Sequence, residues 1–93
     1  MSFVTHHLVT FTECNGEQEY DHHELLVVKE GVDAHAAAFD WIAQNGEVEE
    51  DLVWIDGCRA QKVANTQSIS EAEYLVMRSY LPVIPHPSTR IAA

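Results

Sequence analysis

FVTHHLVTFTECNGEQEYDHHELLVV, residues 3–28, carries the main fold signal of this chain. Apolar and polar residues alternate along both arms of this stretch, and the pair Asn15-Gly16 lies between the arms. An Asn-Gly pair flanked by such arms is the strongest short-range signal for a β-hairpin with a two-residue turn. We therefore predict one long hairpin, in which Phe11 faces Tyr20 and Val9 faces His22.

Cross-strand partners share a face of the sheet, so this register assigns every side chain of the hairpin to one of two faces. The first face is predicted to hold Phe3, Val9, Phe11, Tyr20, Leu26 and Val28. The second is predicted to hold Thr10, Thr12, Glu17, Glu19, Asp21 and His23, with Val4, Leu8, Leu25 and Val27 near its open end. The hairpin should thus be half core and half acidic surface.

Two helices are predicted from their end signals. Asp33 is a good N-cap for a helix over about 34–45, and Gly46 is predicted to end it in the left-handed conformation. Ser70 and Glu73 form the pattern of a capping box, which predicts a second helix over about 71–80. That helix should stop before a proline, because the residue preceding proline avoids the helical region.

A second hairpin is predicted between the helices. Its arms are residues 52–55 and 58–65, and Asp56-Gly57 is again a two-residue turn signal. The predicted register places Trp54 opposite Arg59, where the two side chains could stack as a cation–π pair. Glu47 to Asp51, before the first arm, is predicted to be a charged loop or the frayed entry to that strand.

The order of elements predicts an α+β fold, ββαββα, with a four-stranded antiparallel sheet from two hairpins and both helices on one face. Ninety-three residues are enough for one domain and one core. We assign residues 1–84 to this single domain and residues 85–93 to a proline-containing flexible tail.

Charge is the most unusual feature of the composition. Fifteen acidic residues and five basic ones give a formal net charge of −10, and thirteen of the acids lie between Glu13 and Asp56 with only Lys29 as a base. Such a surface repels nucleic acid and attracts basic protein surfaces, although acidity can also serve solubility alone. The sequence has no long apolar run and no export signal, so we expect a cytoplasmic protein whose two cysteines are reduced rather than disulfide-bonded.

The histidines raise the possibility of a metal site. His7, His22 and Glu24 share a face in the predicted register, and two imidazoles with a carboxylate suit zinc or a non-haem metal. Adjacent histidines on a strand point to opposite faces, however, and no HExxH or CxxC motif is present. No nucleophile motif or phosphate loop is present either, so we expect a non-enzymatic protein without a cofactor.

The remaining hypothesis is recognition through carboxylates. Glu17, Glu19 and Asp21 alternate along one arm, with a repeat of about 6.5–7 Å that is close to the phosphate spacing of a nucleic-acid strand. The predicted partner-binding set is Glu17, Glu19, Asp21, Glu47, Glu49, Glu50 and Asp51, if the loop over 47–51 lies beside the hairpin. Repeated carboxylates are also what an ordinary solvated strand face shows.

In its size, α+β build and acidic strands over 17–24, the chain resembles the small acidic anti-CRISPR proteins of phages and mobile elements. This is a resemblance of overall type without a diagnostic motif, so it assigns no role to any single residue. It implies a phage-encoded inhibitor in the host cytoplasm that mimics nucleic acid and occupies a basic, nucleic-acid-binding surface of a CRISPR-Cas surveillance or effector complex. It implies no direct binding to nucleic acid or membrane. The alternatives are a His-rich metal-binding protein and a small accessory domain of a metabolic system.

Overall fold

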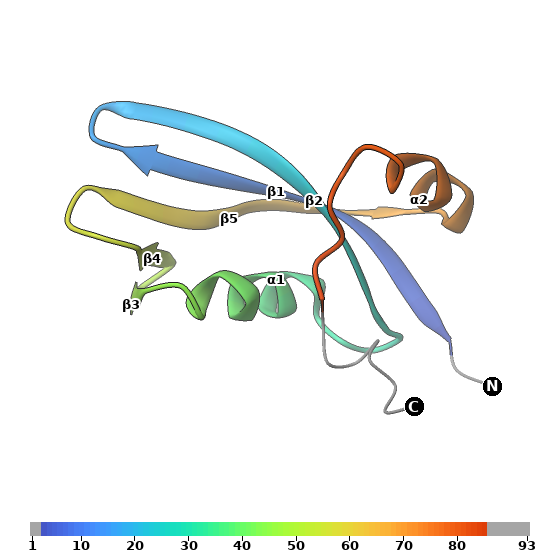
Figure 1. Cartoon of the computed structure of the whole chain (residues 1–93). Coiled ribbons are helices and arrows are strands. Elements are labelled where there is room, and N and C mark those ends of the chain that lie inside the picture. The colour runs from blue at the N-terminus through green and yellow to red at the C-terminus, as the bar shows by residue number, and fades with distance from the viewer. Residues whose placement is uncertain (1–2, 86–93) are drawn as a thin grey trace.

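The computed structural model describes residues 3–85 and has an antiparallel sheet with two helices (Figure 1). The strands are β1 (Val4–Asn15), β2 (Gln18–Lys29), β3 (Glu47–Glu49), β4 (Leu52–Trp54) and β5 (Arg59–Ile69); the helices are α1 (Ala34–Ala43) and α2 (Glu71–Met77). The sheet order is β2-β1-β5-β4-β3. The α+β class is therefore confirmed, whereas the prediction of four strands in the order ββαββα is wrong because β3 adds a fifth strand. Of the predicted tail, all but Pro85 lies outside the described residues.

The long hairpin forms, but its register differs from the predicted one. Asn15 pairs with Gln18, so the central turn residues are Gly16 and Glu17. Gly16 has φ +64°, the conformation that a type II′ turn requires at its first central position. Phe11 consequently lies opposite His22 rather than Tyr20. The pairing of the two strands has shifted by two residues relative to the prediction, and because side chains alternate with a period of two, the predicted faces are preserved.

The core lies between α1 and one face of the sheet. Val9 and Phe11 of β1 are fully buried there, together with Leu26 and Val28 of β2. Asp33 caps α1 as predicted, since its side chain accepts a hydrogen bond of 3.1 Å from the backbone N–H of Ala36. The side of α1 toward the sheet is built from small residues with one large one: Ala34, Ala37, Ala38 and Ile42.

The second helix lies on the opposite face, so the prediction that both helices share a face is wrong. The ring of Tyr74 in α2 contacts that of His6, with 4.8 Å between centroids, and His6 points away from the Val9 face by strand alternation. The predicted capping box is confirmed: Glu73 N–H donates to Ser70 Oγ (3.0 Å), and Ser70 N–H donates to Glu73 Oε1 (2.9 Å).

After α2 the chain passes the outer edge of β2. Leu25 N–H donates to Pro82 O (2.8 Å), and Ile84 N–H donates to Leu25 O (2.7 Å). These bonds position Ile84, which is 1% exposed, so that its side chain joins the core between α1 and the sheet. No helix within residues 3–85 is long and apolar enough to span a membrane.

The second hairpin also differs from its prediction. Trp54 pairs with Ala60, and Ile55 N–H donates to Arg59 O (2.9 Å), so the loop holds three residues, 56–58, instead of two. The Asp56 carboxylate stabilises this longer loop by accepting hydrogen bonds from the backbone N–H groups of Cys58 (2.9 Å) and Arg59 (3.0 Å). The one-residue shift removes the predicted Trp54–Arg59 pair, and Arg59 Nε instead donates to Asp56 Oδ2 (3.1 Å).

Gly46 is needed for a reason other than the predicted one. α1 already ends at Ala43, and Gly46 does not have a positive φ. Its backbone instead lies so close to the carbonyl group of Trp54 that an added Cβ would collide with it. Gly46 therefore allows the start of β3 to approach β4.

Gly46→Ala should lower the free energy of unfolding by about 1–3 kcal/mol, because the colliding group is backbone and only a shift of the strand can relieve the overlap. Gly57→Ala is the matched control. Nothing lies within 4 Å of a Cβ there and φ is not in the left-handed region, so the change should be neutral or stabilise by about 0.4–1 kcal/mol. Urea unfolding of both variants measures the difference. Equal losses would contradict the close approach of β3 to β4.

Candidate functional site

The candidate site is the sheet face opposite α1, at the end of the molecule remote from α2. The pairing of the five strands aligns side chains across this face in the row Glu19, Cys14, Ala60, Trp54 and Glu47. A second row contains Asp21, Thr12 and Lys62 on the first three strands. We call this surface the acidic face, because carboxylates stand along both of its edges.

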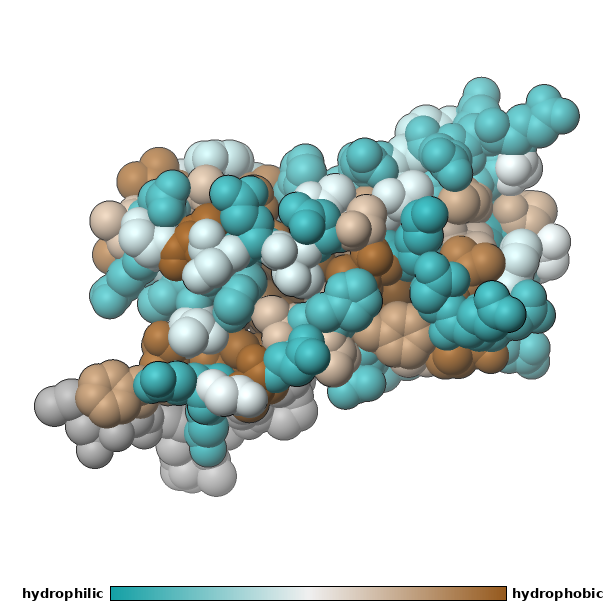
Figure 2. Space-filling view, turned by 180° about the vertical axis from the view of Figure 1, so that it is seen from behind, coloured by the Kyte–Doolittle hydropathy of each residue, from teal (hydrophilic) through white to brown (hydrophobic). Residues whose placement is uncertain are grey.

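The first line of carboxylates lies on β2. Asp21 accepts a hydrogen bond from Thr12 Oγ1 (2.7 Å), and Glu19 accepts one from Cys14 Sγ (3.7 Å), which fixes both on the acidic face. Glu17 lies in the turn rather than on the strand, although it is exposed like the other two. Figure 2 shows the hairpin tip as a hydrophilic protrusion at the upper right.

The second line of carboxylates lies on β3, at the opposite edge of the sheet. Glu47 pairs with Trp54, and Glu49 pairs with Leu52. The segment over 47–51 therefore does not lie beside the hairpin, which was the condition for extending the β2 row. β1, β5 and β4 separate the two lines, which are about 19 Å apart at normal strand spacing. Glu50 and Asp51 form the turn between β3 and β4, where Glu50 has φ 56°.

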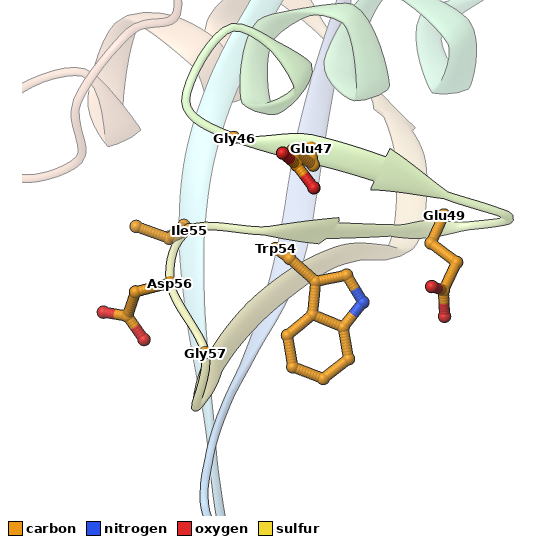
Figure 3. Close-up of a pocket in the computed structure, with 7 residues that line it drawn as sticks. All are labelled: Gly46, Glu47, Glu49, Trp54, Ile55, Asp56 and Gly57. Atoms are coloured by element: carbon orange, nitrogen blue, oxygen red, sulfur yellow. The ribbon is translucent and has the colours of Figure 1, made fainter.

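A pocket of about 600 Å³ opens beside the second line (Figure 3). Its lining residues are Gly46, Glu47, Glu49, Trp54, Ile55, Asp56 and Gly57. The half-buried indole of Trp54 extends to the same side of the ribbon as the Glu47 and Glu49 carboxylates. Within residues 3–85, neither of these two carboxylates nor the indole N–H has a hydrogen-bond partner.

Asp56 lines the pocket, but its carboxylate already accepts hydrogen bonds from residues of its own loop and from Arg59. Its hydrogen bonds from the backbone N–H and thiol of Cys58, followed by the one from Arg59, lower the pKa of the carboxyl to about 2. The same contact raises the pKa of the Cys58 thiol, while desolvation and the Glu19 carboxylate raise that of Cys14. Both cysteines are free, and their raised pKa values favour the unreactive thiol form.

The histidine cluster is only partly assembled. His22 Nε2 lies 3.0 Å from Glu24 Oε2, and the His22 ring stacks on Phe11. His7 is instead hydrogen-bonded to Thr5 (2.8 Å), and its pKa is lowered by desolvation and by the neighbouring His6. In the part of the chain that the structure describes, no group of three His, Cys, Asp or Glu side chains is placed to hold a metal ion.

Comparison with known proteins adds no assignment: the chain has no significant match among protein-family models, curated proteins or solved structures. The sequence predicts the carboxylates of both lines but not the Trp54 pocket. The missed signal was Asp56, whose side chain can bond to backbone N–H groups two and three residues ahead and so favour a longer loop.

Asp56 should contribute a pH-dependent part of the stability. A carboxyl whose folded pKa is depressed from 3.8 to about 2 stabilises the fold fully above the unfolded pKa and loses this effect as pH falls toward 2. The melting-temperature difference between wild type and Asp56→Asn should therefore be constant above about pH 4 and shrink between pH 4 and 2. Asp40→Asn is the control, because Asp40 is exposed and its carboxylate makes no hydrogen bond within residues 3–85. A gap for Asp56→Asn that is unchanged down to pH 2 would contradict the assignment.

Proposed function

We propose that this protein is a non-enzymatic binding protein whose acidic face occupies a basic, nucleic-acid-binding surface of a protein complex. The observation that carries the proposal is the pair of carboxylate lines, on β2 and β3, at the two edges of one sheet face. In its narrowest form, the partner is a CRISPR-Cas surveillance or effector complex, and the protein is an inhibitor that takes the place of nucleic acid.

The charge distribution supports a protein partner rather than nucleic acid. Glu17, Glu19, Glu47 and Glu49 are exposed, and Lys62, between the two lines, is half-buried. A phosphate backbone would meet uniform repulsion along either edge, whereas lysine and arginine side chains would be attracted to both edges. The wide spacing of the lines means that such a partner must contribute cations from an extended surface rather than from one point.

The proposal predicts that Glu17→Lys/Glu19→Lys abolishes binding to a sensitive surveillance complex and restores that complex's binding to labelled DNA. Like charges would then face one another across the contact. Asp21 is left unchanged, because it accepts the Thr12 hydroxyl and its substitution would mix a folding effect with a binding effect. Both positions are exposed, and Glu19 accepts only the weak 3.7 Å hydrogen bond from the Cys14 thiol, so the free energy of unfolding should change by no more than about 0.5 kcal/mol.

Glu30→Lys/Asp40→Lys is the matched control, with the same change in net charge at exposed positions outside the acidic face. It should retain most of the affinity. Affinity should also fall as salt rises from 0.1 to 1 M, since the Debye length shortens from about 10 to 3 Å. If both variants bind alike, or if binding is independent of salt, the acidic face is only a solvated surface.

A further inference from the structure

We propose that the Trp54 pocket receives an arginine side chain of the basic partner, an inference that rests on the proposed function and locates one contact within it. The pocket joins an aromatic ring to two carboxylates in one concave space (Figure 3). Glu47 lies directly across the strands from Trp54, and Glu49 lies on the adjacent diagonal of the same face. Such neighbours have Cβ atoms about 4.5–8 Å apart, close enough for one guanidinium group to contact side chains on either side of it.

The protein's own bases leave this pocket open to a cation from outside. Arg59, the base nearest to it in the sequence, is held by Asp56 through its Nε at 3.1 Å. Lys62 lies on β5 across from Thr12, two residues along the strand from Ala60, the residue that pairs with Trp54. Among residues 3–85, no cation pairs with Glu47 or Glu49.

The chemistry of the three groups favours arginine over lysine. A planar guanidinium can stack on the indole and still donate N–H groups from its edge to a carboxylate, whereas an ammonium is a compact and strongly hydrated point charge. The pocket volume of about 600 Å³ is ample for one such side chain. Carboxylates alone also favour a guanidinium, because it can donate two parallel hydrogen bonds to one carboxylate. The part of the preference that depends on the indole is therefore the part that is diagnostic of the pocket.

The test compares octa-arginine and octa-lysine peptides in calorimetric titrations of the full chain at fixed ionic strength. Octa-arginine should bind about two- to fivefold more tightly than octa-lysine. Trp54→Leu should lose most of this preference, and Glu47→Gln/Glu49→Gln should weaken octa-arginine more than the control Glu30→Gln/Asp40→Asn does. Equal binding of both peptides by the wild type, or a preference that is undiminished in Trp54→Leu, would overturn the inference.

Fluorescence gives a readout that does not depend on Trp54→Leu folding. The chain has two tryptophans, so in Trp41→Phe all of the tryptophan emission, excited selectively over the three tyrosines, comes from Trp54. Octa-arginine should change this emission, and arginine amide should do so only at far higher concentration. Unchanged emission at saturation overturns the inference, and arginine amide binding as tightly as the peptide shows a site for a free small molecule instead.

The two proposals fail separately. Suppose that Glu17→Lys/Glu19→Lys no longer binds the surveillance complex, while Trp54→Leu keeps full affinity for the complex and for octa-arginine. The proposed role of the acidic face is then supported, and the proposed arginine pocket is wrong. If Glu17→Lys/Glu19→Lys binds that complex as well as the wild type does, the proposed function falls, whatever the peptides show.

Discussion

The two-sided pairing of β1 is the constraint on which the rest of this structure depends. Its twelve residues pair with β2 on one side and, through ten of them, with β5 on the other. A strand paired on both sides satisfies its own backbone groups, and its alternating side chains then define both faces of the sheet. Val9 and Phe11 direct the core toward α1, while Thr12 and Cys14 contact the carboxylates of the acidic face. The core and the candidate site are therefore opposite sides of one strand.

The sequence predicted the faces of the long hairpin better than its pairings. Asn15-Gly16 supplies a residue that tolerates positive φ, but only Gly16 adopts it, and the turn moves one position along the chain. Register errors of two residues leave every side chain on its face. The one-residue error at Asp56-Gly57 had a larger effect. It placed Arg59 opposite Trp54 in place of Ala60, so the open pocket beside Trp54 was not predicted. Local turn statistics do not include the hydrogen bonds that the Asp56 side chain offers to the loop.

Two further differences from the prediction, the fifth strand β3 and the position of α2, come from tertiary structure. Four acids around Val48 have low strand preference, and β3 forms because Gly46 lets its backbone approach β4. The position of α2 had a visible signal: Leu8 and Leu25, on the second face of the hairpin, needed a cover. A hairpin with apolar residues on both faces at one end requires packing on both sides there, which a layer of helices on one face cannot provide. The histidine cluster fails to form for a local reason, the two-residue change of register: His22 pairs with Phe11, four residues along β1 from His7.

Carboxylates on β2 and β3 also have a structural explanation, since both are edge strands. Charged side chains on an edge hinder pairing with the edge of another molecule, and the same residues can serve that purpose here. Edge protection requires charge but not a particular sign, and lysine is a common choice for it. It accounts neither for the same negative sign at both edges of one face nor for a half-buried indole beside Glu47 and Glu49. A cationic partner accounts for the common sign and the aromatic group together, while the carboxylates keep their protective role in the unbound protein.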